Sequence, residues 1–249
     1  MTHFTHIELE EGIISVDDPK GVRMFVINGS ERSILIDTGY GNGDLKAYVE
    51  PLITHHPYEI ICTHGHGDHT LGMKDFDSAW MDTVDINLVH ASLRPKIKPF
   101  TKEKFELGGI TLRLCPFIGH TSGMVCILIE ERRAMILSDA CNTQTWVWLD
   151  ESSTIAQYKE ELLKFKATYG DLFDKIYLSH SDPKSFPLEL MDEVLDVCNA
   201  ILNGKDEKVP FSYGGYGTGS EFYAYAVNEK GLRADGKLGN IVYSANKIK

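Results

Sequence analysis

The sequence predicts an α/β fold with mixed sheets. Two observations carry this prediction: short apolar runs near the N-terminus are joined by a hairpin signal, and later strand-like runs are linked by amphipathic helices. The composition agrees, because 43% of the 249 residues are hydrophobic and 24% are charged, which is enough apolar material for a core. No repeat, low-complexity tract or linker divides the chain, so we expect one domain over residues 1–249.

The expected strands are short apolar runs bounded by turn residues. They lie at residues 13–16, 23–28, 33–37, 58–63, 110–118, 124–130, 134–138 and 175–179. Asn28-Gly29, between the second and third runs, favours a hairpin because both residue types tolerate positive φ. The charged turn Glu131-Arg132-Arg133 joins two later strands.

Two helices are expected, at residues 153–169 and 187–203. In the first, apolar residues recur at helical spacing and Gly170 supplies the stop. In the second, Pro187 suits the first turn and Gly204 follows the end. Residues 205–249 are rich in tyrosine and glycine, so we expect a loop and a closing hairpin there. This tail either lines a pocket or forms a contact between copies, which leaves a homodimer open.

The charge balance argues against nucleic acid as a partner. Asp and Glu number 36 against 25 Lys and Arg, a net charge of −11, and no dense basic run offsets it. No apolar run reaches the length that spans a bilayer, and the N-terminus has neither a basic start nor an apolar stretch typical of a signal peptide. Five scattered cysteines are expected to be reduced thiols, which favours a cytoplasmic protein that does not act at a membrane.

Residues 64–69 read HGHGDH, a pattern that chance composition explains poorly. Imidazole and carboxylate are preferred ligands of zinc and similar divalent metals. The two glycines permit a tight turn, so we expect His64 and His66 to face one point and Asp68 and His69 another. The alternative is a polar loop that merely contains histidine.

Four ligand-type side chains stand just past the end of an expected strand: His64, His120, Asp139 and His180. Open α/β sheets place their ligands along this rim, so we expect the four to lie close together. The other histidines lack this context and are expected at the surface or in loops: His3, His6, His55, His56 and His90.

These residues resemble the metallo-β-lactamase superfamily of metal-dependent hydrolases. The resemblance covers roughly residues 10–185 and includes LIDTG (35–39), THGHGDH (63–69), GHTSG (119–123), Ser138-Asp139 and His180. It implies a four-layer αββα sandwich with a binuclear site at one edge of the two sheets. By the family pattern, one metal is held by His64, His66 and His120, the second by Asp68, His69 and His180, and Asp139 bridges both.

The resemblance implies two divalent ions as cofactors, with zinc expected and iron or manganese left open. A shared carboxylate offsets the repulsion between two close cations, and a metal-bridging hydroxide then serves as the nucleophile. Asp68 is the expected catalytic residue, because it can orient this hydroxide and carry a proton to the leaving group. The metals polarise the substrate carbonyl.

The complete ligand set is similar to the glyoxalase II and acyl-homoserine lactonase branches. This implies a hydrolase of a small-molecule ester, thioester or lactone. Asp139 and the lack of a secretion signal argue against an antibiotic-degrading enzyme. A glutathione thioester is possible but not favoured, because the sequence has no convincing basic C-terminal helix pair to bind the glutathione carboxylate. The alternatives are a phosphodiester hydrolase, a di-iron redox enzyme on the same fold, and a metal-holding module without catalysis.

Five aromatic residues are candidates for substrate binding: Tyr40, Trp146, Trp148, Tyr213 and Tyr216. The two tryptophans follow a ligand-bearing strand and could form an apolar wall, with the two C-terminal tyrosines as a lid. The alternative is packing against the helix near Ser153, and strand alternation is expected to send one tryptophan inward and one outward. Tyr40 lies between two glycines in a turn, where its ring either packs against the turn or its hydroxyl donates to an oxyanion.

Overall fold

The computed structural model describes residues 4–181, 185–214 and 217–249. Its first sheet runs in sequence order through β1 (Thr5–Glu10), β2 (Ile13–Asp17), β3 (Arg23–Asn28), β4 (Ser33–Ile36), β5 (Glu59–Ile61), β6 (Ala79–Met81) and β7 (Ile97–Pro99). Pairs from β1 to β4 are antiparallel and pairs from β4 to β7 are parallel. The sheet is therefore mixed, as the sequence predicts.

The second sheet has the order β13-β11-β10-β9-β8. Its members are β8 (Lys104–Glu106), β9 (Thr111–Pro116), β10 (Val125–Ile129), β11 (Ala134–Ser138) and β13 (Lys175–Leu178). β10 is antiparallel to both its neighbours, and β11 is parallel to β13. The carboxyl ends of β9, β11 and β13 therefore meet at one edge of the sheet.

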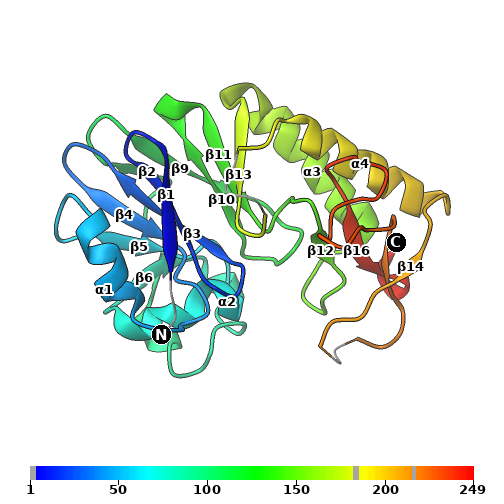
Figure 1. The fold of residues 1–249 in the computed structure, drawn as a ribbon, viewed down its shortest axis with the longest axis horizontal. Coiled ribbons are helices and arrows are strands. Elements are labelled where there is room, and N and C mark those ends of the chain that lie inside the picture. The colour runs from blue at the N-terminus through cyan, green and yellow to red at the C-terminus, as the bar shows by residue number, and fades with distance from the viewer. Residues whose placement is uncertain (1–3, 182–184, 215–216) are drawn as a thin grey trace.

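The described residues contain four α-helices: α1 (Leu45–Val49), α2 (Gly67–Thr70), α3 (Ile155–Tyr169) and α4 (Glu189–Leu202). Side-chain alternation along the strands places the two sheets face to face: Phe25 and Ile27 of β3 pack in the layer between the sheets, with Ile127 of β10. Met24 and Val26 point the other way, toward the layer that contains α1. Helices α3 and α4 pack on the outer face of the second sheet. The four layers confirm the αββα prediction (Figure 1).

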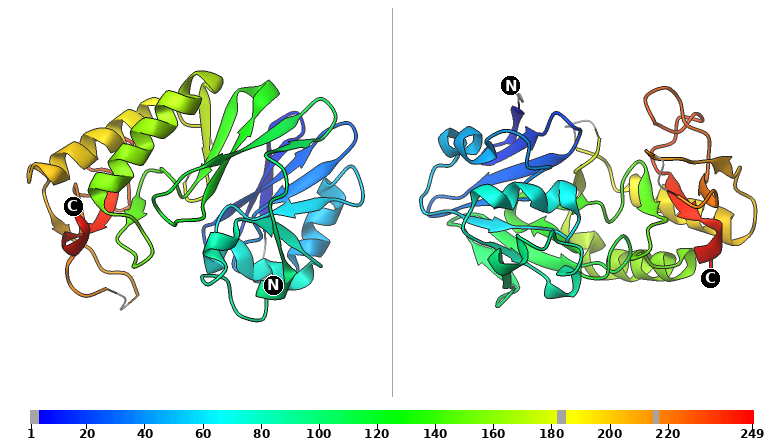
Figure 2. Two further views of the ribbon diagram at one scale, coloured as in Figure 1. Left: turned by 180° about the vertical axis from the view of Figure 1, so that it is seen from behind. Right: turned by 90° about the horizontal axis from the view of Figure 1, so that it is seen from below.

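A third, smaller sheet lies at the C-terminal end of the chain. It has the order β12-β16-β15-β14, from β12 (Thr145–Val147), β14 (Val209–Pro210), β15 (Glu221–Tyr223) and β16 (Ile241–Ser244). β15 and β16 are antiparallel neighbours, while β12 and β16 are parallel. Figures 1 and 2 show this sheet beside the far ends of α3 and α4, away from the N-terminal sheet. The two helices therefore connect the sandwich to the third sheet.

Eight strands were expected from the sequence, and each is present with its ends shifted by at most two residues. The β3–β4 hairpin is confirmed, but the reason given for it is wrong, because neither Asn28 nor Gly29 has a positive φ. Gly29 is instead required by close approach: a Cβ there would lie 2.0 Å from the carbonyl oxygen of Leu107. The strands that sequence reasoning missed are β1, β6, β7, β8 and β12, most of them only three residues long.

Both long helices were also expected. Helix α3 begins two residues late because Thr154 and Gln157 form a capping box. Helix α4 ends before Gly204, which has a left-handed φ of 62°. Gly170 does end α3, but in a right-handed conformation that continues as a 3-10 turn. Among the described residues, no helix combines the length and apolar character needed to cross a bilayer.

Candidate metal centre

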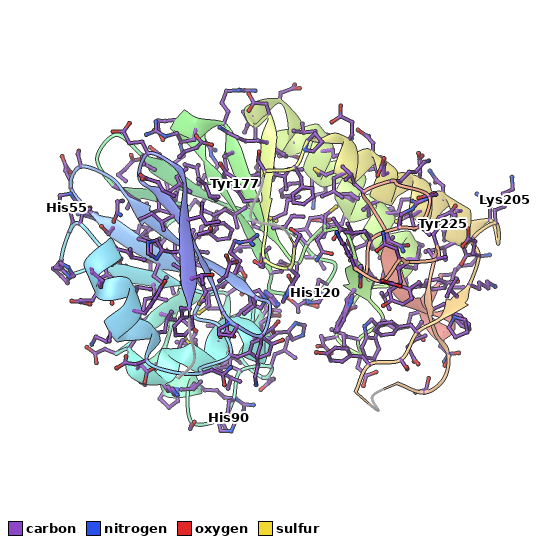
Figure 3. The ribbon with its side chains drawn as sticks, viewed as in Figure 1. His55, His90, His120, Tyr177, Lys205 and Tyr225 are labelled. Atoms are coloured by element: carbon purple, nitrogen blue, oxygen red, sulfur yellow. The ribbon has the colours of Figure 1, made fainter. Side chains whose placement is uncertain are left out.

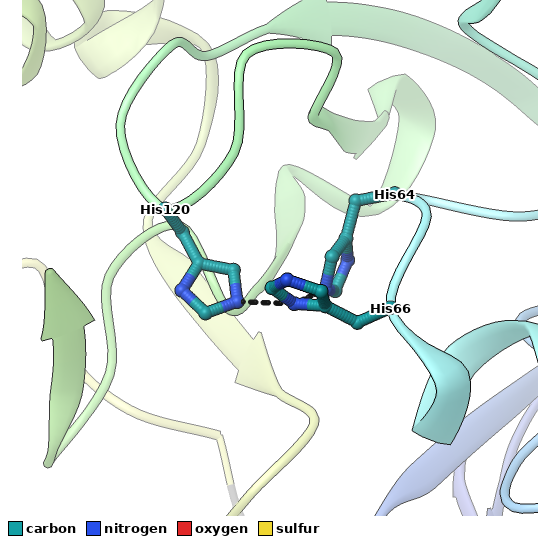
Figure 4. A group of neighbouring side chains, drawn as sticks. All are labelled: His64, His66 and His120. Carbon is teal, nitrogen blue, oxygen red and sulfur yellow. Dashed lines mark hydrogen bonds between the residues drawn. The ribbon is translucent and has the colours of Figure 1, made fainter. Parts of the chain in front are cut away.

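Three histidines form the first group of converging side chains. His64 and His66 come from the loop after β5, and His120 from the loop after β9. Nε2 of His64 lies 3.1 Å from Nδ1 of His66, which lies 2.9 Å from Nε2 of His120. Figure 4 shows the three rings turned toward one another. The structure thus brings together the three histidines that the sequence pattern grouped.

The outer nitrogen of each ring contacts an oxygen. The distances are 3.1 Å from His64 Nδ1 to Thr63 Oγ1, 2.5 Å from His66 Nε2 to Glu151 Oε1, and 2.7 Å from His120 Nδ1 to the carbonyl oxygen of Trp146. A carboxylate and a carbonyl can only accept, and Thr63 donates its own proton to Asp37 Oδ2 at 2.9 Å. Each neutral ring therefore carries its proton outward and presents a lone pair inward.

Three inward lone pairs with no proton between them repel one another unless a cation lies among them. Nitrogen ligands about 2.0–2.1 Å from a tetrahedral zinc ion are about 3.3 Å apart, close to the spacings of 3.1 and 2.9 Å here. Outer partners that fix the tautomer are also the usual support of metal-binding histidines. The donor set of this first group therefore fits a divalent metal.

The second group contains two carboxylates and two imidazoles. Nε2 of His180 lies 3.2 Å from Asp68 Oδ2 and 3.4 Å from Asp139 Oδ2. Nε2 of His69 lies 3.6 and 3.5 Å from the same two oxygens. Asp139 Oδ2 is also 3.6 Å from Nε2 of His120 in the first group. Asp139 therefore lies between the two groups.

Two buried atoms in this second group have no hydrogen-bond partner among the described residues: Nε2 of His69 and Oδ1 of Asp139. His69 donates from Nδ1 to Asp37 Oδ2 at 2.8 Å, so its Nε2 is the nitrogen available to a metal. Burial lowers the pKa of His69, but Asp37, Asp68 and Asp139 outweigh it and raise the pKa well above its usual value, so a metal would displace a proton from this nitrogen. His180 likewise donates from Nδ1 to the carbonyl of Gly21 at 3.0 Å. Buried polar atoms without a partner are costly, and a cation bound by both atoms would remove that cost. The second group also fits a divalent metal.

The pKa values of the carboxylates and their neighbours follow from this crowding. Burial raises the pKa of Asp68, but His69 and His180 outweigh it and bring the value to about 2. Burial lowers the pKa of His180, but Asp139 and Asp68 raise it to about 10. Asp139 is also held well below its usual pKa, because His180 and His69 outweigh its burial. Both carboxylates are therefore ionised at neutral pH, as metal ligands need to be.

The first group behaves differently. Burial, reinforced by the neighbouring imidazole of His66, lowers the pKa of His120 to about 4. The pKa of His64 is well below its ordinary value for the same reason, with His69 the strongest of its charged neighbours. These rings are neutral at pH 7, which is the state that binds a metal.

Asp37 supports both groups from behind. Its Oδ1 accepts from the backbone N–H of Thr63 at 2.7 Å, and its Oδ2 accepts from His69 Nδ1. It follows β4 directly and has a positive φ of 61°, as Ser138 has beside Asp139, with φ 51°. Sequence reasoning noted Asp37 only within the LIDTG turn, although it occupies the same place after a strand as the ligand-type residues.

Asp85 joins the loops that carry the three histidines. It is buried, and its carboxylate accepts from the N–H of Gly65 at 3.2 Å, from Thr121 Oγ1 at 2.6 Å and from the N–H of Gly123 at 2.8 Å. A Cβ at Gly65 or Gly123 would approach Asp85 within 3.0 Å, so these two positions need glycine for close approach. Nothing in the sequence pattern singled out Asp85.

The segment 149–152 supports the first group from the other side. Glu151 contacts His66, and Ser152 Oγ donates to the carbonyl of His120 at 2.8 Å. Lys247 Nζ, from the C-terminus, donates to the carbonyls of Leu149 at 2.7 Å, Asp150 at 3.0 Å and Ser152. Sequence reasoning missed Glu151 and Lys247, because nothing local relates a loop to a chain end nearly a hundred residues away.

The two groups open onto a cavity of about 1230 Å³. Of the candidate substrate residues, Tyr40, Trp146 and Tyr213 line it together with Asp68, Asp139, His66, His120 and His180. Trp148 is not among the described lining residues, and Tyr216 lies outside the described part of the chain. Figure 3 shows His120 near the middle of the molecule, between the N-terminal sheet and the third sheet.

The expectation that one tryptophan points inward and the other outward is wrong. The rings of Trp146 and Trp148 contact each other with centroids 5.6 Å apart, and both contact Phe211. Residues two apart in an extended chain share a face, and alternation separates only adjacent residues such as Val147, which is buried. Tyr213 joins this aromatic cluster, its ring centroid 4.9 Å from that of Trp146.

Comparison with known proteins places the fold and the site in context. The sequence profile of the metallo-beta-lactamase superfamily matches residues 17–172, which is more than half of the chain and contains six of the seven ligand-type side chains. The chain belongs to the metallo-β-lactamase superfamily. The resemblance based on the sequence motifs is therefore confirmed at the level of this superfamily.

Members of the superfamily with related sequences carry thioesterase and lactamase-like names. The chain is 27% identical over 124 residues to an atrochrysone carboxyl ACP thioesterase of Aspergillus fumigatus, covering 48% of this chain and 29% of that protein. It is 34% identical over 125 residues to a lactamase-like protein of Penicillium aethiopicum, covering 48% and 40%. The matched part thus spans well under half the length of these relatives.

A longer match is to the beta-lactamase-like protein 2 homolog of Caenorhabditis elegans, 25% identical over 190 residues, covering 71% of this chain and 61% of that protein. Among solved superfamily structures, a metallo-beta-lactamase from Pontibacter korlensis has a TM-score of 0.67 at 15% identity, over 79% of this chain and 99% of that one. One from Erythrobacter litoralis has a TM-score of 0.61 at 17% identity, over 79% and 96%. At these identities the likeness concerns the fold.

Proposed function

We propose that this chain is a binuclear metal-dependent hydrolase of a small-molecule thioester, ester or lactone. The observation that carries the proposal is the convergence of five imidazoles and two ionised carboxylates, with Nε2 of His69 and Oδ1 of Asp139 buried and without a hydrogen-bond partner among the described residues. In this proposal His64, His66 and His120 hold one ion, Asp68, His69 and His180 hold the other, and Asp139 contacts both. Zinc suits these donors, and iron or manganese would also accept them.

When bound, the two ions supply Lewis acidity, which activates water as the nucleophile and polarises the scissile carbonyl. The chain's own side chains orient the attacking water and protonate the leaving group. Asp68 lines the cavity with an ionised carboxylate, 3.2 Å from His180, so it can accept a proton from the attacking water and release it to the leaving group. His69 and His180 donate from Nδ1 to Asp37 and to the carbonyl of Gly21, which leaves Nε2 as the nitrogen that would give up its proton to bind the ion.

The walls of the cavity favour an acyl substrate. Trp146 and Tyr213 present half-buried and exposed aromatic faces beside the two groups. Small-molecule sites combine such apolar walls with a few polar anchors. The thioesterase names of several relatives support a thioester among the three ester-like classes. We also propose that residues 1–249 form one domain, because α3 and α4 pack on the second sheet and contact the third.

The deciding experiment measures metal content and hydrolysis on the same preparation. Protein purified without added metal is analysed for zinc, iron and manganese, its visible spectrum is recorded, and thioesters, esters, lactones and a phosphodiester are assayed. Two zinc ions per chain with turnover of an ester-like substrate supports the proposal. Turnover of the phosphodiester alone, or two iron ions with visible absorption and no hydrolysis, overturns it. Metal binding that stays below two per chain after zinc is added overturns the binuclear assignment.

A further inference from the structure

We propose that the cavity contains a second recognition site, formed by Lys230 and Lys237, that binds an anionic group of the substrate. The group is a carboxylate or a phosphate remote from the bond that is cleaved. This inference deepens the proposed hydrolase function and rests on it for the identity of the scissile bond. Both lysines line the same cavity as the metal-ligand groups, but they come from the C-terminal segment after β15.

Lys230 lies in a tight turn that backbone and side-chain hydrogen bonds hold in place. Val227 and Arg233 form an antiparallel bridge at its base, and the N–H of Asn228 donates to the carbonyl of Leu232 at 2.8 Å. The side chain of Asn228 accepts from the N–H of Lys230 at 2.9 Å and from that of Leu232 at 3.2 Å. An ordered backbone lowers the entropy lost when a ligand binds to the side chain at its tip.

The hairpin is also attached to the segment that follows Asp139. The side-chain amide of Gln144 donates to the carbonyl of Gly231, and both residues line the cavity. A Cβ at Gly231 would lie 2.5 Å from Gln144 Nε2, and its φ of 74° is left-handed, so only glycine fits. The tip that carries Lys230 is therefore positioned relative to a ligand-bearing strand.

Lys237 is held in a similar way. The two backbone N–H groups that follow it, of Leu238 and Gly239, donate to Glu193 Oε2 of α4 at 2.5 and 2.9 Å. Arg233, in contrast, is buried and used within the fold: it pairs with Asp235, donates to the carbonyl of Gly239 at 2.9 Å and stacks on Tyr225, 4.1 Å from its ring centroid. Lys230 and Lys237 are exposed and line the cavity.

The charge distribution selects an anion. The chain has a net charge of −11, yet the part of the cavity wall that contains Lys230 and Lys237 is cationic. The carboxylates that line the cavity lie elsewhere: Asp68 and Asp139 belong to the metal-ligand groups, and Glu151 contacts His66. A cationic wall in a partly enclosed cavity of an acidic protein concentrates anions locally. Apolar lining residues, among them Leu149 and Leu232, lie on the same cavity surface. The substrate class is therefore an acyl compound with an apolar part and an anionic end.

Four thioesters distinguish where the anion lies. Butyryl and succinyl groups are compared as thioesters of coenzyme A and of N-acetylcysteamine, so the anion is in the leaving group, the acyl group, both or neither. With zinc-loaded protein, we expect kcat/KM for the neutral butyryl N-acetylcysteamine thioester to be lowest. Lys230→Gln with Lys237→Gln should lower kcat/KM about tenfold for the anionic substrates, mainly through KM, and less than twofold for the neutral one.

Lys205→Gln is the matched control, because Lys205 is an exposed lysine beyond the end of α4 and outside the cavity (Figure 3). Equal losses for anionic and neutral thioesters, or an equal loss in the control, overturn the subsite. Calorimetric binding of coenzyme A and of glutarate tests the subsite without turnover. If no thioester is hydrolysed but the double variant loses this binding, the hydrolase proposal fails while the subsite stands; if the wild type binds neither, the subsite fails.

Discussion

Replacing Asp37 with asparagine tests whether the tautomer of His69 controls metal binding. The carboxylate faces donors on both sides: Thr63 N–H lies 2.7 Å from Oδ1, and His69 Nδ1 lies 2.8 Å from Oδ2. Asparagine offers only one acceptor, so its NH₂ must face one of these donors. The left-handed φ of 61° is well tolerated by asparagine, so the backbone is not the cause of any effect.

Two outcomes of the substitution are available, and both are costly. If the amide nitrogen faces His69, the ring moves its proton to Nε2 and that nitrogen can no longer bind a metal. If the amide nitrogen faces Thr63, a buried N–H loses its acceptor at about 1–3 kcal/mol of folding free energy. Loss of an outer partner of a metal-binding histidine costs about 10–100-fold in metal affinity. We expect Asp37→Asn to lower the affinity for one of the two proposed metal ions by that factor.

The assay is competition for zinc with a chromophoric chelator, combined with thermal unfolding of the metal-free protein. Asp85→Asn is the matched control, since Asp85 is a buried carboxylate that accepts from backbone N–H groups and a hydroxyl but from no histidine. It should lower stability by a similar amount while leaving zinc affinity at the proposed site of Asp68, His69, Asp139 and His180 unchanged. Unchanged zinc affinity together with unchanged thermal stability in Asp37→Asn would refute the argument, because one of the two donors must lose its acceptor.

Two further predictions concern the same cluster. Asp139→Ala should abolish most hydrolysis and weaken the binding of at least one metal, because the carboxylate between the two groups is lost. His90→Ala should keep the wild-type metal content. Two metals by elemental analysis and normal turnover in Asp139→Ala would contradict the bridging role. In chelator-treated protein, thermal stability should be highest near pH 6.5. Above it, the contribution of His180, whose pKa Asp139 and Asp68 raise to about 10 despite burial, is lost as pH rises toward that value. Below it, His120, whose pKa burial lowers to about 4, stays neutral while the unfolded chain takes up protons, so stability falls. A flat melting profile from pH 4 to 10 would contradict this.

The sequence by itself determined the mixed α/β character, both long helices and the group of metal-ligand candidates. These features are local: strand and helix periodicity depend on near neighbours, and His64, His120, Asp139 and His180 each lie within four residues of a strand end. Because β9, β11 and β13 run in the same direction within one sheet, the residues just past them meet at one edge, as local rules predict. His64 follows β5 of the other sheet, so its approach to that edge depends on how the two sheets pack.

Only the tertiary structure decided what surrounds that cluster. The parallel pairing of β12 with β16 joins segments almost a hundred residues apart, and Lys247 reaches the loop of Glu151 through the same arrangement. The hairpin that carries Lys230 meets Gln144 across a similar separation. Such contacts have no period or spacing along the chain, because they depend on where whole elements pack. For this reason the sequence indicated the metal-ligand candidates, whereas the outer partners of the histidines and the cationic wall emerged only from the folded chain.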